Sequence, residues 1–284
     1  MKTIVAATDF SPRSAVAVNK AAALAKLSGA RLALVHAINP RSFFGRLFNK
    51  IGVESALEAS KKRLNETLEA LGVQGEAIAL EGAPSATIIQ TAKELQADLI
   101  ALGDHGEFHI SDLLLGTTAR RAIELADLPI LVVKNENAVP YKRVMIAADF
   151  SESSVNAANF ALESFGDAEF IVFNAYLAPN DITASYYGAL TDEASSMLET
   201  MRNEAIANLD EFVKSPIFGD REVKTIVRAS ASPSDTILET ARGEGVDLIV
   251  AGAKGIESFV PMMIGSSAES LLRRSDIDML VARR

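Results

Sequence analysis

The sequence predicts an α/β protein built from two tandem doubly wound parallel-sheet domains. Short apolar runs alternate with helical patterns along the first half of the 284 residues. Such alternation is typical of a parallel sheet covered by helices on both faces. The second half repeats the motifs of the first, and the length is sufficient for two domains. We place the domains at residues 1–137 and 141–284 and expect strand order 3-2-1-4-5 in each.

Local signals define the elements of the first half in order. Ser11 followed by Pro12 is a typical helix start, and an amphipathic helix is indicated by Leu57, Leu64, Leu68 and Leu71. The predicted strands are 2–8, 31–38, 76–80, 98–102 and 130–134, and the predicted helices are 12–29, 57–71, 84–96 and 116–126.

The second half repeats the first at two offsets. Asp9-Phe10-Ser11 recurs 140 residues later as Asp149-Phe150-Ser151, whereas Pro84 and the residues after it recur 149 residues later at Pro233. Nine additional residues must therefore lie between these motifs in the second half, and we expect them around residues 177–200. Gene duplication with one enlarged loop is the simplest explanation.

Glycines recur at the same spacing in both halves and predict a phosphate-binding cradle. Glycines free the backbone to turn, so that successive N–H groups can converge on an anion. The third glycine of each set, followed by hydroxyl residues, begins a helix whose first N–H groups attract anions. The alternative is that the glycines only shape turns. The two sets are Gly103, Gly106 and Gly116 with Thr117 and Thr118, and Gly252, Gly255 and Gly265 with Ser266 and Ser267.

Asp9 and Asp149 each follow the first strand of their half. With the predicted strand order, the switch point lies between the first and fourth strands, so Asp9 faces Gly103 and Asp149 faces Gly252. A carboxylate repels phosphates, so we expect it at the sugar or base end of a nucleotide. The alternative is that each aspartate caps the helix that follows it.

The composition of the chain argues against several classes of function. The chain has no cysteine and a net charge of −9, with the acidic excess entirely in the second half, so a nucleic-acid partner is not expected. No apolar run is long enough to span a membrane, and Asp9 comes too early for a signal peptide, so a cytoplasmic location is expected. The three histidines have no accompanying ligand cluster, and we expect neither a protein-bound metal nor a catalytic residue.

These motifs resemble the universal stress protein family in its tandem form. The resemblance rests on Asp9 and Asp149 with their flanking residues, on both glycine sets and on the closing strands 129–133 and 277–281, and it covers nearly the whole chain. The spacing G-x-x-G, nine residues, then G-[S/T] is the signature of ATP-binding members. The implied fold is that of the adenine nucleotide alpha hydrolase-like proteins.

The resemblance implies a nucleotide site in each half. In the first half, adenosine would lie near Ala7, Thr8, Asp9 and Ala37, with Leu102 and Gly103 closing the pocket, His105 and Gly106 at the ribose or phosphates, and Gly116, Thr117 and Thr118 at the phosphate tail. The matching residues of the second half are Ala147, Ala148, Asp149, Ala175, Ala251, Gly252, Lys254, Gly255, Gly265, Ser266 and Ser267. The ligand would be ATP, ADP or AMP, with Mg²⁺ bound through the phosphates.

The resemblance also implies a role and an assembly. The role is that of a stress-response sensor or regulator without fast turnover, acting on an unknown protein partner. Family members pair through their last strands, so the two halves would form an internal pseudo-dimer, and a further homodimer is left open.

The two predicted cradles differ in the charge of one residue each. Asp104 places a negative charge in the first cradle and Lys254 a positive charge in the second, which favours the second for polyphosphates.

Two other functions are alternatives to a nucleotide-binding regulator. One is a slow ATPase or nucleotide-activating enzyme, although no Walker-type loop is present. The other is a protein-interaction module in which one or both sites are empty.

Overall fold

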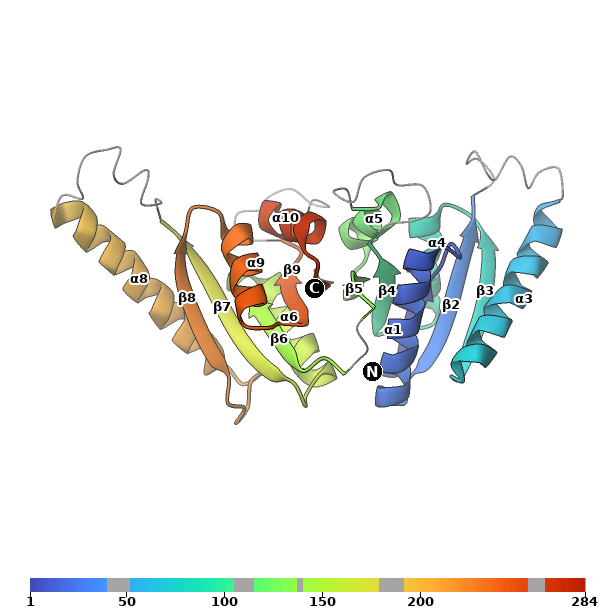
Figure 1. Ribbon diagram of the computed structural model, residues 1–284, viewed down its shortest axis with the longest axis horizontal. Helices are drawn as coiled ribbons and strands as arrows, with labels where there is room; N and C mark the ends of the chain where they lie inside the picture. Colours follow the sequence, from blue (N-terminus) through green and yellow to red (C-terminus); the bar gives the residue numbers. More distant parts are fainter. Residues whose placement is uncertain (40–51, 105–114, 137–139, 179–191, 255–263, 284) are drawn as a thin grey trace. The chain divides into compact units, whose positions relative to one another are not determined.

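The computed structural model describes residues 1–39, 52–104, 115–136, 140–178, 192–254 and 264–283 (Figure 1). The chain divides into two compact units. The first comprises Met1–Pro140 together with Leu272–Arg284, and the second comprises Tyr141–Leu271. Among the described helices, none is long and apolar enough to cross a membrane.

The first unit contains the predicted parallel sheet. Its strands have the order β3-β2-β1-β4-β5, so the predicted order 3-2-1-4-5 is confirmed here. In chain order, the elements are β1 (Thr3–Ala7), α1 (Pro12–Ser28), β2 (Arg31–Ile38), α3 (Val53–Leu71), β3 (Gly75–Glu81), α4 (Pro84–Glu94), β4 (Leu99–Gly103), α5 (Thr117–Leu125) and β5 (Ile130–Val133).

The second unit repeats this arrangement over four parallel strands in the order β9-β6-β7-β8. Its elements are β6 (Arg143–Ala147), α6 (Glu152–Ser164), β7 (Glu169–Leu177), α8 (Asp192–Val213), β8 (Lys224–Ser230), α9 (Pro233–Gly243) and β9 (Leu248–Gly252), and the chain ends with α10 (Ser266–Arg274) and β10 (Asp278–Ala282).

The last strand of the second half, β10, belongs to the first unit. It pairs antiparallel with β5, and Leu280 lies opposite Leu131. The predicted pairing of the two last strands within one chain is therefore confirmed.

After their first residues, Thr3 and Arg143, the central strands β1 and β6 are entirely apolar, because both sheet faces are covered. Ile4 and Val5 of β1 are completely buried, as are Val144 and Met145 of β6. Continuous apolar runs of this kind are typical of parallel sheets between helical layers. Their carboxyl ends, where the apolar runs stop, carry the polar residues of the candidate site.

The position predicted for the additional residues of the second half is wrong. The connections 39–52 and 178–191, which precede α3 and α8, are equally long. Instead, α8 has 22 residues against 19 in α3, and the connection after it spans 214–223 against only 72–74 in the first half. Within 214–223, Phe218 is buried and packs edge-on against Phe212 at 5.3 Å between ring centroids. The added segment thus covers apolar surface, which the offsets alone do not reveal.

Candidate functional site

Each unit has a switch point at the carboxyl ends of its strands. β1 lies between β2 and β4, and the chain leaves it towards β2 but returns through β4 on the other side. β6 lies in the same way between β7 and β9. Open parallel sheets bind ligands at such points. Asp9 follows β1 and Gly103 ends β4, as Asp149 follows β6 and Gly252 ends β9.

Asp9 shapes the turn between β1 and α1. Its Oδ1 accepts a hydrogen bond from the backbone N of Ser11 at 3.0 Å, and Phe10 between them has a φ of 64°. The N-cap residue of α1 is Ser11, whose Oγ accepts from the backbone N of Ser14 at 3.2 Å. The alternative in which Asp9 itself caps the helix is therefore incorrect, although Asp9 supports the capping residue.

The second unit repeats this turn around Asp149. Its Oδ1 accepts from the backbone N of Ser151 at 3.0 Å and from the Ser151 hydroxyl at 2.6 Å. Ser151 caps α6, and Phe150 has a φ of 63°. Two copies of one strained turn thus hold an aspartate at the same place in each unit.

His36 and Asn174 contribute to the two sites and were not identified from the sequence. His36 Nδ1 lies 2.8 Å from the carbonyl oxygen of Thr8, and Asn174 Nδ2 donates to the carbonyl oxygen of Ala148 at 2.8 Å. Each thus holds the residue that precedes the aspartate. His36 comes directly after the residue of β2 that pairs with Ala7, and Asn174 comes directly after the residue of β7 that pairs with Ala147. The two residues are therefore equivalent, and an alignment of the repeats strand by strand would have revealed them.

One aromatic ring lies beside His36 in the first unit, and one guanidinium group lies over that ring. The Phe10 ring lies 4.5 Å from the His36 ring, and the Arg63 guanidinium carbon lies 4.3 Å from the Phe10 centroid. Burial lowers the pKa of His36 below 6.5, against the opposing effects of its hydrogen bond to Thr8 and of the Asp9 charge. The neutral imidazole is therefore the favoured form beside this turn.

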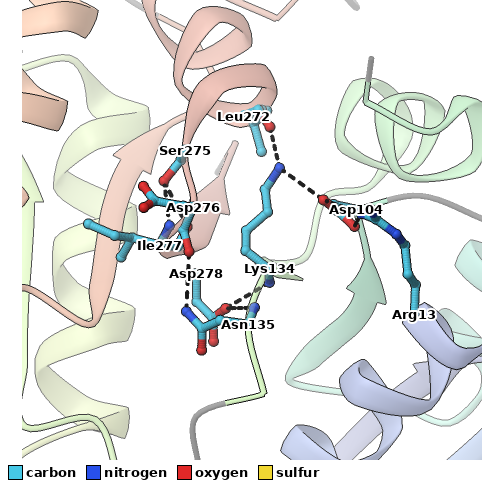
Figure 2. A network of polar contacts seen from close by, with 9 residues as sticks. All are labelled: Arg13, Asp104, Lys134, Asn135, Leu272, Ser275, Asp276, Ile277 and Asp278. Atoms are coloured by element: carbon cyan, nitrogen blue, oxygen red, sulfur yellow. Dashed lines mark hydrogen bonds and ion pairs between the residues drawn. The ribbon is translucent and has the colours of Figure 1, made fainter. Parts of the chain in front are cut away.

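Asp104 is paired with cations, which changes the electrostatic expectation for the first cradle. Its carboxylate lies 3.3 Å from Arg13 Nη1 and 3.5 Å from Lys134 Nζ (Figure 2). Its side chain is only 12% exposed, whereas that of Arg13 is 48% exposed. The repulsion of phosphates expected from the sequence is thus offset by two neighbouring positive charges.

Gly252 has a packing role that the cradle hypothesis did not anticipate. A Cβ at this position would lie 2.5 Å from Ser153 Oγ and 2.7 Å from the backbone N of Ser154, both at the start of α6. Ser153 Oγ also donates to the carbonyl oxygen of Lys254 at 2.5 Å, and Ser151 Oγ lies 3.0 Å from the same oxygen. The chain after β9 is therefore tied closely to the first turn of α6.

The starts of α5 and α10 are tied to the preceding strands. Gly116 donates its backbone N–H to the carbonyl oxygen of Asp104 at 2.7 Å, and Gly265 donates to that of Ala253 at 2.8 Å. Gly116 is the N-cap residue of α5 and has no side chain with which to cap it. The residues that follow, Thr117 in one unit and Ser266 in the other, are exposed.

Most predicted site residues lie at the two switch points. His105, Gly106 and Gly255 lie outside the described residues, so the middle of each glycine set has no structural account. In the parts of the chain that the structure describes, no group of three or more His, Cys, Asp or Glu residues could hold a metal ion. The predicted residues found at the carboxyl ends of the strands or at the start of the following helix are Ala7, Thr8, Asp9, Ala37, Leu102, Gly103, Gly116, Thr117, Thr118, Ala147, Ala148, Asp149, Ala175, Ala251, Gly252, Lys254, Gly265, Ser266 and Ser267.

Comparison with known proteins gives matches in both halves. The model of the universal stress protein family matches residues 1–134 and again 140–283. A universal stress protein of Thermus aquaticus is 35% identical over 135 residues, which cover 47% of this chain and 98% of that protein. One of Methanocaldococcus jannaschii is 34% identical over 140 residues, which cover 47% of this chain and 82% of that protein.

A solved structure matches the whole chain. The crystal structure of a universal stress protein from Archaeoglobus fulgidus superposes with a TM-score of 0.69 at 22% identity, covering 99% of this chain and 98% of that one. At this level of identity, the likeness concerns the fold. Together with the two family matches, it leads to one conclusion: the chain belongs to the universal stress protein family and carries two of its domains in tandem.

Proposed function

We propose that each half of this chain binds an adenine nucleotide, ATP or its relatives ADP and AMP, at the carboxyl ends of its first and fourth strands. On this proposal, the protein is a cytoplasmic stress-response sensor or regulator without fast turnover. The observation that carries it is the repetition of one arrangement, an aspartate beside a serine-capped helix and a glycine that ends the adjacent strand, at both switch points.

The aspartates are suited to the nucleoside end of the ligand. Asp9 and Asp149 are part-buried, and backbone N–H groups already orient their carboxylates. An ionised carboxylate accepts strong hydrogen bonds from ribose hydroxyls. Because hydrogen bonds within the chain hold each turn, the carboxylate needs little reorganisation on binding.

The phosphate end is suited to the starts of α5 and α10. The first N–H groups of a helix have no partner within the helix and lie at the positive end of its dipole. Lys254 in the second unit and Arg13 in the first supply positive charge beside β9 and β4. Mg²⁺ would be held through the phosphates and would neutralise their charge there.

The first test is mass spectrometry of small molecules released from the purified, denatured protein, followed by calorimetric titration with Mg-ATP and with adenosine. We expect close to two adenine nucleotides per chain, or two binding events in the titration. Absence of both would refute the nucleotide proposal and favour an interaction module with empty sites. Hydrolysis of bound ATP at a rate that supports turnover would favour the enzyme alternative.

Two variants test the proposed orientation of the nucleotide in the second unit, with its phosphates near Lys254 and its ribose near Asp149. Lys254→Ala should weaken ATP binding roughly tenfold but leave adenosine binding unchanged, because it removes only a charge near the phosphates. Asp149→Asn should weaken both ligands, since an amide keeps the acceptor that the Ser151 backbone N–H needs but loses the charge offered to ribose. The same loss for both ligands in both variants would contradict this orientation.

A further inference from the structure

A buried ion pair lies where the last strand of the chain pairs with β5. Lys20 Nζ of α1 lies 2.9 Å from Asp278 Oδ2 of β10, and their side chains are 3% and 0% exposed. Asp278 Oδ1 accepts from the backbone N–H groups of Lys134 at 2.7 Å and Asn135 at 3.2 Å (Figure 2). Both oxygens of this carboxylate are thus used within the first unit.

The pair occurs on one side of the duplicated chain only. The offset of 149 residues that relates the glycine sets makes Pro129 the counterpart of Asp278. The offset of 140 residues that relates the two capped helices makes Phe160 the counterpart of Lys20. The positions equivalent to the charged pair Lys20–Asp278 are therefore occupied by the uncharged residues Phe160 and Pro129.

We propose that Lys20 and Asp278 select the strand that pairs with β5, favouring the last strand of this chain over β5 of a second copy. Specificity of this kind requires an element that penalises the wrong partner as well as contacts that favour the right one. A buried charge that finds its counter-charge in only one pairing is such an element.

The strand register shows what pairing of two β5 strands would lose. Leu131 lies opposite Leu280, its own counterpart, so two β5 strands in this register would meet with Leu131 opposite its copy. Pro129 of the second copy would then replace Asp278. Lys20 would keep Asn135 Oδ1 at 3.5 Å but lose the carboxylate that lies 2.9 Å from its Nζ, and the N–H groups of Lys134 and Asn135 would lose their shared acceptor.

Pairing of two β10 strands would fail for the complementary reason. Asp278 would then face the position of Phe160 instead of Lys20, so the fully buried carboxylate would lose the ammonium group that lies 2.9 Å away. An uncompensated buried charge disfavours its complex by roughly a hundredfold or more. Only the mixed pairing of β5 with β10 satisfies both charges.

Because β5 and β10 belong to one chain, their pairing is favoured simply by being intramolecular. The test therefore cuts the chain between them. A protease site is inserted into the full chain between Asn135 and Tyr141, the folded protein is cut, and the fragments exchange in moderate urea before native mass spectrometry. The two fragments differ in mass, so complexes of like and unlike fragments are resolved. We expect the unmodified sequence to give only complexes of one fragment with the other.

Variants decide whether the ion pair is responsible. Lys20→Met with Asp278→Leu removes both charges at similar volume, and like-fragment complexes should then rise towards their statistical share of about half. Asp278→Asn alone keeps an acceptor for the two N–H groups and should also raise that share, which covers the case in which the double variant fails to fold. Removal of the exposed Arg31–Glu76 pair is the control and should change nothing.

Either of two results would overturn the proposal. The first is a statistical mixture of complexes from the unmodified sequence. The second is exclusively mixed complexes from the variants that lack the buried charge pair, because some other feature must then select the partner strand.

Discussion

Gly252 offers a direct test of how the second cradle is built. In Gly252→Ala, the new methyl group would lie 2.5 Å from Ser153 Oγ, 2.7 Å from the backbone N of Ser154 and 3.0 Å from the carbonyl carbon of Ser153. Two of these three atoms belong to the backbone at the start of α6, so a rotamer change cannot relieve the contact. The Ser154 N–H is also the one that Ser151 caps, at 3.2 Å.

The expected loss of stability follows from these contacts. Overpacking that displaces backbone costs about 1–3 kcal/mol, and a weakened N-cap adds up to about 1 kcal/mol. Hydrogen exchange of the β9 amides, measured by mass spectrometry on ligand-free protein, reports on this unit alone and does not assume that both units unfold together. A change below about 0.5 kcal/mol would refute the packing argument.

Gly243→Ala is the matched control. Nothing lies within 4 Å of a Cβ at Gly243, and this residue ends α9 without a positive φ. Alanine should therefore be neutral or stabilise by up to about 1 kcal/mol. The contrast matters for function, because a bulky residue at Gly252 would disturb α6 whether or not a phosphate binds there. Loss of nucleotide binding in Gly252→Val would thus not identify a phosphate contact.

Three further predictions concern the first unit. Lys20→Met alone should lower the unfolding free energy by about 3–5 kcal/mol in guanidinium titrations, because the buried Asp278 carboxylate loses the ammonium group 2.9 Å away. Because burial lowers the pKa of His36 below 6.5, the unfolded chain binds this proton more tightly; stability should fall as the pH drops through 6.5 and level off below the folded pKa. His36→Asn, which copies Asn174, should remove that part of the pH dependence, and an unchanged profile would contradict it. Ser11→Ala should cost about 1 kcal/mol in thermal unfolding through loss of the α1 cap, and full stability would show that Asp9 suffices.

Much of the fold could be predicted because its signals are local. Alternation of apolar runs with helical periodicity identifies βα units, and right-handed crossovers then leave few strand orders. For the same reason, the sequence alone placed Asp9 and Gly103 at adjacent strand ends, where the structure has them. The repeat offsets located the corresponding pair, Asp149 and Gly252, in the second half.

Only the tertiary structure decided how side chains distant in sequence are paired. From the sequence, Asp104 is expected to repel phosphate. The structure places Lys134, thirty positions later in the chain, 3.5 Å from its carboxylate. From the sequence, Asp278 is only an acidic residue at the start of an apolar strand. In the structure it forms a buried ion pair with Lys20 of the first helix. Periodicity determines which face of an element is buried, because it depends on neighbours along the chain. Which charges share that buried space depends on how the elements pack, and no local pattern encodes it.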